Sequence, residues 1–273
     1  MEKRRTSTRL KLRAIFVICT FCSLLSGRAA FAVNLSAEEA LRIGKKVWQN
    51  ECGGSVAGLT SWNAGENFAS LGIGHFIWYP EGLRGPFDES FPKFLAFATA
   101  HQTNVPERLR QARACPWNSR AEFLTSQNSA QMSELRHFLA HTVDLQAQFL
   151  VARLQNALAK MLEEASPAER ANIQRQFERV GSTSSGCYAL VDYVNFKGEG
   201  VLATERYRDQ GWGLLQVLEG MHGSENGIAA AREFSQSAAA VLKRRVQNSP
   251  PERKESRWLP GWINRVKSYS GNS

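Results

Sequence analysis

NFASLGIGHFIWYP (residues 67–80) places two glycines and a histidine between runs of apolar residues. It lies in a longer segment, 53–90, which is rich in glycine, asparagine and aromatic residues. This segment alone has the composition of short strands and turns, and a glycine within a strand often marks a close approach by another group. The sequence therefore predicts a small β-containing lobe at about 53–90.

The rest of the chain has helical periodicity and helix-start signals. Three serines are followed by glutamate at capping-box spacing: Ser36 and Glu39, Ser119 and Glu122, and Ser166 and Glu169. Pro167 would occupy the first position of its helix. We expect helices at 36–51, 120–164 with a break near His141, 167–180, 185–195, 226–247 and 260–269. The predicted fold is α+β and predominantly α-helical, with a small β-containing lobe, a larger helical lobe and a ligand cleft between them.

The first 32 residues have the pattern of a cleaved export signal. A basic start precedes an apolar stretch of 14 residues, AIFVICTFCSLLSG, and then the small-x-small sequence AFA at 30–32. An uncleaved membrane anchor is the alternative. We therefore expect an exported protein, periplasmic or secreted, with one domain at 33–273 and membrane contact only through the signal peptide.

Removing this segment changes the charge. It leaves 27 of the 34 basic and 24 of the 25 acidic residues, a net charge of +3 in place of +9. No long basic run lies outside the leader, so a nucleic-acid partner is not expected.

Three cysteines, Cys52, Cys115 and Cys187, remain after residue 32. One disulfide plus a free thiol, or three buried thiols, are equally open, because an exported protein can keep disulfides. Their spacing matches no metal framework. His137 and His141 lie one helical turn apart but lack a third ligand, so no metal is expected.

A carboxylate upstream of the quoted stretch is a candidate catalytic group. Leu41, Gly44 and Trp48 are spaced to share one helix face, and the same stripe reaches Glu51 just before CGG ends the helix. Partial desolvation at such a lobe boundary disfavours a charged carboxylate, as a general acid near neutral pH requires. A helix-terminal glutamate that is simply solvated is the other interpretation.

ECGG through GENFASLGIGHF resembles the active-site segment of phage-type lysozymes over about 35 residues. In that family a first helix ends in the catalytic glutamate, and a strand of the β-lobe carries a hydroxyl residue before Gly-Ile-Gly-His. The matching positions are Glu51, Ser70, Gly72, Ile73, Gly74 and His75. The resemblance implies that Glu51 is the general acid, that Ser70 orients a water molecule, and that Gly74 and His75 lie against the substrate.

The chain departs from this pattern at the second acidic position, which is Ala64; Glu66 is the nearest substitute. If Glu66 lies far from Glu51, an acid-only site could still cut by intramolecular attack, as a lytic transglycosylase does. Glu199 and Glu205 are spare acids.

A second stretch, 194–221, also combines glycines with aromatic and polar residues. Within it, GWGLLQ resembles a short Gly-Leu-Met-Gln stretch of Slt-type lytic transglycosylases. The candidate substrate-binding residues here are Asn195, Tyr207, Trp212 and Gln216. Equally open is the structural interpretation, in which the glycines cap helices and the aromatic residues fill the core.

The resemblances imply an exported, lysozyme-like glycosidase that cuts the β-1,4 bond after N-acetylmuramic acid in peptidoglycan. Chitosan or chitin is a related amino-sugar substrate. We expect no cofactor, since carboxylates and water suffice for this reaction, and a monomer. The alternative is a non-catalytic protein that binds peptidoglycan or a related polymer. The absence of an acidic residue at position 64, which is Ala64, favours this alternative. A thiol hydrolase that uses Cys52 is the third hypothesis.

Overall fold

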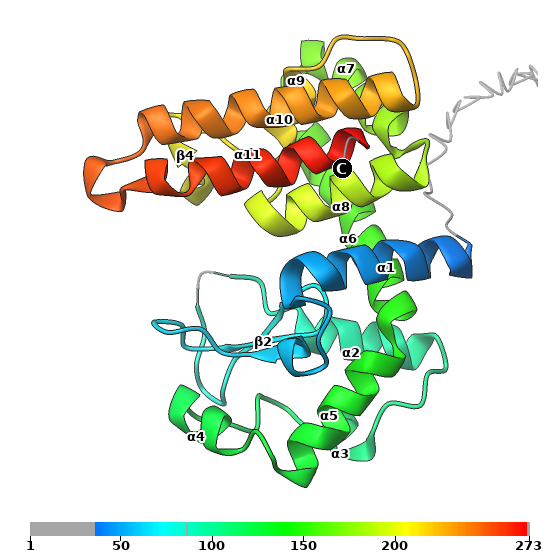
Figure 1. Ribbon diagram of the computed structural model, residues 1–273, viewed down its shortest axis with the longest axis vertical. Helices are drawn as coiled ribbons and strands as arrows, with labels where there is room; N and C mark the ends of the chain where they lie inside the picture. Colours follow the sequence, from blue (N-terminus) through cyan, green and yellow to red (C-terminus); the bar gives the residue numbers. More distant parts are fainter. Residues whose placement is uncertain (1–35, 86, 272–273) are drawn as a thin grey trace, which may run out of the picture. The chain divides into compact units, whose positions relative to one another are not determined.

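The computed structural model describes residues 36–85 and 87–271, and this part of the chain is predominantly helical with two small antiparallel sheets (Figure 1). The α+β prediction is confirmed at this level. The predicted export signal lies outside the described residues. Among the residues described, no helix is both long and apolar enough to span a membrane.

The helices, strands and 3₁₀ turns follow one another along the chain without a repeating pattern. The α-helices are α1 (Ala37–Cys52), α2 (Phe91–Ala100), α3 (Glu107–Gln111), α4 (Arg120–Thr125), α5 (Ala130–His141), α6 (Val143–Glu164), α7 (Pro167–Gly181), α8 (Ser184–Lys197), α9 (Leu214–Glu219), α10 (Ile228–Asn248) and α11 (Leu259–Lys267). The strands are β1 (Thr60–Ser61), β2 (Ala69–Leu71), β3 (Phe76–Trp78), β4 (Arg206–Tyr207) and β5 (Gln210–Gly211). Short 3₁₀ turns are η1 (Ala57–Leu59), η2 (Ala203–Glu205), η3 (Pro251–Arg253), η4 (Glu255–Arg257) and η5 (Ser268–Ser270).

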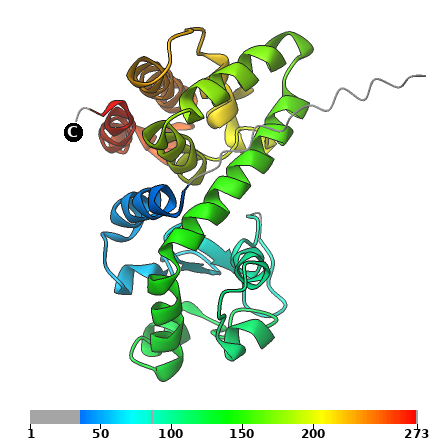
Figure 2. The same cartoon turned by 90° about the vertical axis from the view of Figure 1, so that its right-hand side faces the viewer.

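The first sheet is the predicted β-containing segment. Its order is β1-β2-β3, with Ser61 opposite Ser70 and Ser70 opposite Ile77. The edge strand β3 packs on α2. The ring of Phe76 in β3 stacks on Phe94 of α2 and meets Phe149 of α6 edge-on. The sheet is thereby fixed to α6, which carries Phe149 and runs on to contact α7 and α8 (Figure 2).

Helix α1 begins and ends as its sequence predicts. The Ser36 hydroxyl accepts the Glu39 N–H at 3.2 Å, and the Glu39 carboxylate accepts the Ser36 N–H at 3.0 Å, so the capping box is confirmed. Gly53 and Gly54 have φ of 61° and 68°, and Gly54 N–H donates to the Trp48 carbonyl at 3.2 Å. Left-handed glycines close the helix directly after Cys52, and so place Glu51 in its last turn.

The predicted core stripe of α1 is confirmed in part: Gly44 is buried and Trp48 packs against the core, but Leu41 is exposed. Leu41 is 36% exposed, whereas Ala40, Ile43 and Val47 are buried against the rest of the fold. The buried face therefore includes Gly44 but is centred slightly before the predicted one, because Ala40 has less apolar weight in the sequence pattern than Leu41.

The other helix predictions hold in part. Ser119 caps α4 by accepting the Glu122 N–H at 3.2 Å, whereas the Ser166 side chain makes no capping bond even though Pro167 begins α7. The stretch 120–164 contains three helices, α4, α5 and α6, and the predicted break near His141 is the one between α5 and α6. Helices α2, α3 and α9 were not expected.

All three cysteines of the described chain are free and buried. Of the two alternatives left open, three buried thiols is the one that the structure contains. No disulfide among them contributes to stability.

Candidate functional site

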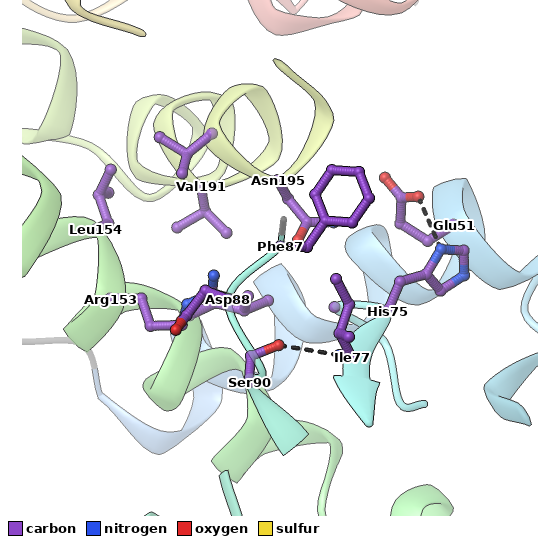
Figure 3. A pocket seen from close by; sticks show the side chains of 13 residues that line it. Glu51, His75, Ile77, Phe87, Asp88, Ser90, Arg153, Leu154, Val191 and Asn195 are labelled. Carbon is purple, nitrogen blue, oxygen red and sulfur yellow. Dashed lines mark hydrogen bonds and ion pairs between the residues drawn. The ribbon is translucent and has the colours of Figure 1, made fainter. Parts of the chain in front are cut away.

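A cavity of about 240 Å³ opens beside the end of α1 (Figure 3). The end of α1, the turn before β3, the segment 87–90 and the facing sides of α6 and α8 form its walls. Its polar lining residues are Glu51, His75, Asp88, Ser90, Arg153 and Asn195. Two of the sequence candidates, Glu51 and His75, lie side by side at one end of it (Figure 3).

Glu51 is held by an arginine from the last helix. Its side chain is 13% exposed, and its Oε1 accepts a hydrogen bond from Arg265 of α11. Arg265 also donates to both carboxylate oxygens of the fully buried Asp192, at 2.8 and 2.9 Å. Tyr269 donates to Asp192 as well, at 2.5 Å. One oxygen of Glu51 is therefore fixed by a chain of charged groups from α8 and α11.

The charge state of Arg265 follows from the same contacts. Burial lowers its pKa, but the hydrogen bonds and negative charges of Asp192 and Glu51 outweigh burial, and the net effect is to raise it. Arg265 is thus a permanent cation that is hydrogen-bonded to Glu51.

His75 connects Glu51 to Cys52. His75 Nδ1 lies 3.8 Å from Glu51 Oε2, and His75 Nε2 lies 3.8 Å from Cys52 Sγ. The order thiol, imidazole, carboxylate is that of a cysteine hydrolase. However, burial and the nearby Glu51 charge raise the pKa of Cys52 to about 12, so the group is a thiol and not the nucleophilic thiolate.

The two glycines of the quoted stretch are required by packing. A Cβ at Gly72, whose φ is 71°, would lie 2.3 Å from Gln146 Oε1, which accepts the Ile73 N–H at 2.9 Å. A Cβ at Gly74 would lie 2.5 Å from the Phe76 ring and 2.9 Å from Leu150. The chain therefore passes close to α6 at this turn, and Gly74 also lines the cavity.

The other two residues proposed for catalysis lie away from the cavity. Ser70 is 4% exposed in β2 and is not one of the lining residues. Glu66 lies in the turn between β1 and β2, where its carboxylate accepts a hydrogen bond from Asn63 at 3.1 Å. Ala64 is exposed in the same turn.

The candidates from 194–221 separate in the same way. Asn195 lines the cavity, whereas Gln216 bonds within its own region, to Gly213 N–H at 3.0 Å and to the Gly200 carbonyl at 3.2 Å. Trp212 is 6% exposed, and Tyr207 donates to Glu255 at 2.9 Å. The sequence candidates at the cavity are therefore Glu51, Gly74, His75 and Asn195, and those outside it are Glu66, Ser70, Tyr207, Trp212 and Gln216.

A larger cavity, of about 1030 Å³, lies next to the first cavity. Both are lined by Phe87, Asp88, Arg153 and Val194, so they adjoin each other, and we call the two together the groove. It runs from Glu51 to Glu205, whose pKa is raised by burial although backbone N–H groups of Leu202 and Gly200 oppose that shift. A groove of this extent has room for several units of a polymer.

Asp88 and Arg153 line both cavities, and the sequence did not single out either residue. Asp88 lies in the predicted β-containing segment, so the sequence could have identified its carboxylate as a candidate site residue. Arg153 lies within a regular helix, and no motif in the sequence distinguishes it. Arg265 was not connected with Glu51 by the sequence either. The two residues are 214 positions apart in the chain.

No family model, curated protein or solved structure matches this chain. The chemistry of the groove must therefore be inferred from its own residues. Those described include no group of three or more His, Cys, Asp or Glu side chains that could hold a metal ion.

Proposed function

We propose that this protein is a lysozyme-like glycosidase that cleaves peptidoglycan with Glu51 as the general acid. The observation that supports it is the position of Glu51: a largely buried carboxylate, at the end of a helix, facing a cavity that forms part of a polymer-sized groove. The proposed cut is at the β-1,4 bond after N-acetylmuramic acid, in a wall to which the protein is exported.

The two oxygens of Glu51 have different surroundings, and this suggests which one would act. Oε1 accepts the hydrogen bond from Arg265, whereas Oε2 is 3.8 Å from His75 Nδ1, too far for a hydrogen bond. Oε2 is thus the oxygen that would carry the proton and give it to the leaving glycosidic oxygen. Arg265 would hold the carboxyl group in place while the proton leaves.

A second carboxylate decides the product. Asp88 shares the cavity with Glu51 and replaces Glu66 as our candidate for a base or stabilising group. With Asp88 acting on water, the outcome is hydrolysis to reducing ends. With Glu51 acting alone, intramolecular attack gives the anhydro product of a lytic transglycosylase.

A binding protein without turnover is the second candidate, and one observation favours it. Glu51 belongs to an ion-pair network with Arg265 and Asp192, an arrangement that can serve only to hold α1, α8 and α11 together. A thiol hydrolase is disfavoured, because the pKa of Cys52 is raised to about 12, chiefly by burial.

The test is digestion of purified sacculi by the protein and by its Glu51→Gln variant, with mass spectrometry of the released fragments. Reducing muropeptides from the wild type alone would support a muramidase, and 1,6-anhydro ends a lytic transglycosylase. Binding to sacculi without release by either chain would contradict cleavage and favour the binding protein. Equal release by both chains would remove Glu51 from the mechanism.

A further inference from the structure

The charged residues that line the groove are paired, with one exception. Lys93 bonds Asp88 at 2.5 Å, Lys160 bonds both oxygens of Glu199 at 3.0 Å, Glu205 accepts backbone N–H groups of Gly200 and Leu202, and Glu51 is bonded by Arg265. Arg153 makes no hydrogen bond or ion pair with any residue in the described ranges; its nearest aromatic contact, the Phe149 ring, has its centroid 6.0 Å away.

Arg153 occupies the junction of the two cavities. It projects from α6 and lines both of them, together with Phe87, Asp88 and Val194. Burial lowers its pKa, while the charges of Asp88 and Glu199 act in the opposite direction without reaching it as hydrogen-bond partners. The half-buried guanidinium has five N–H donors, and none of them is both buried and unpaired, so they are open to the groove. A ligand that brings a carboxylate to this point would satisfy those donors.

We propose that Arg153 forms an anionic subsite, which binds a carboxylate on an acidic substituent of the glycan strand. This inference rests on the proposed function and specifies its substrate class. N-acetylmuramic acid bears a lactyl group that either ends in a carboxylate or continues into a peptide with carboxylates, whereas N-acetylglucosamine bears neither. Arg153 therefore selects the acidic strand over chitin-like polymers, which present only neutral groups at the junction.

The experiment measures binding by calorimetry in full-length chains that carry Glu51→Gln, so that no probe is cut. Three tetrasaccharides serve as probes: one of N-acetylglucosamine alone, one that alternates N-acetylglucosamine with N-acetylmuramic acid bearing free lactyl carboxylates, and the same alternating strand carrying stem peptides. The first separates charge from sugar recognition. The other two distinguish a lactyl from a peptide carboxylate.

We expect at least one acidic probe to bind roughly tenfold tighter than the neutral one, as a charge-assisted hydrogen bond to a carboxylate would give. Arg153→Met should reduce that ratio to about one and leave binding of the neutral probe unchanged. Arg153→Lys should retain an intermediate preference for the acidic probes, because lysine keeps the charge but cannot make bidentate hydrogen bonds to a carboxylate. Arg232→Met, at an exposed arginine of α10, is the matched control and should retain the full ratio.

The subsite is overturned if the parent chain binds all probes alike, or if Arg153→Met keeps the preference. Should Arg153→Met fail to fold, as judged by circular dichroism, a ratio in Arg153→Lys equal to that of the parent would overturn it. Failure of the proposed function gives a different result: Arg153-dependent binding with no fragments released from sacculi by the wild type would refute cleavage and leave the subsite intact. Fragment release with an unaffected binding ratio would refute the subsite alone.

Discussion

The two glycine-rich aromatic stretches, 67–80 and 194–221, have similar compositions and both contribute residues to the groove, but the aromatic candidates of the second stretch lie outside it. In the first, Gly74, His75 and Ile77 line an open cavity. In the second, Trp212 is 6% exposed and Tyr207 is tied to Glu255. Residue types that suit sugar binding therefore indicate a site only where their faces and polar groups lack partners inside the protein.

The largest expected effect is on the chemical reactivity of the three cysteine thiols. It also tests whether Cys52, which lies beside His75, is a nucleophile. Burial raises the pKa of each of Cys52, Cys115 and Cys187 to about 12, so the thiolate fraction at pH 8 is roughly a thousandfold smaller than in an unfolded chain. Reactivity should increase as the pH rises toward 12.

We expect iodoacetamide at pH 8 to leave these three residues unmodified in the native protein and to modify all of them in urea. Peptide mass spectrometry gives the result residue by residue. Rapid native modification of Cys52 accompanied by loss of activity would instead favour the thiol hydrolase.

Trp212→Ala tests whether the buried tryptophan of the second stretch is structural. Trp212 is buried, the Arg245 guanidinium lies 4.0 Å from its ring centroid, and its carbonyl accepts the Tyr193 hydroxyl. Removing the indole should lower the free energy of unfolding by about 3–5 kcal/mol, measured by urea denaturation. A loss below about 1 kcal/mol together with a loss of sugar binding would make Trp212 a ligand residue.

Asp88→Asn and Glu66→Gln compare an acid in the groove with one outside it. We expect Asp88→Asn to lower kcat on sacculi about 10²-fold, the lower end for a general base. Glu66→Gln should leave kcat within about twofold, because its carboxylate bonds within its own turn. The opposite ranking of the two variants would restore Glu66 to the mechanism and remove Asp88.

Tyr207→Phe is expected to have the smallest effect. It removes one hydrogen bond to Glu255, whose carboxylate keeps both bonds from Arg245 at 2.8 Å. The free energy of unfolding should fall by about 1 kcal/mol in urea denaturation, with no change in sacculus binding. A binding defect without destabilisation would mean that Tyr207 faces the ligand.

Local signals in the sequence predicted the local structure. Ser36, Glu39 and the glycines after Cys52 set both ends of α1, and the segment 53–90 contains the first sheet. The buried face of α1 was found in part: Gly44 is buried and Trp48 packs on the core, but Leu41 is exposed while its neighbour Ala40 is buried.

The partners of Glu51 could not be found in this way. Its bond to Arg265 and the place of Arg153 beside Asp88 depend on how distant helices pack, and no short spacing encodes that. Similarly, Glu66 is nearer to Glu51 in sequence than Asp88, yet Asp88 is the acid that shares its cavity.

The central claim is that the groove beside Glu51 binds the glycan strand, and its most direct test is a crystal structure of Glu51→Gln with the alternating tetrasaccharide. We predict a strand that runs through both cavities, with a glycosidic oxygen within hydrogen-bonding distance of the side chain at position 51. Sugar bound against Trp212, or in the separate cavity lined by Glu219 and Arg244, with the groove empty, would contradict it.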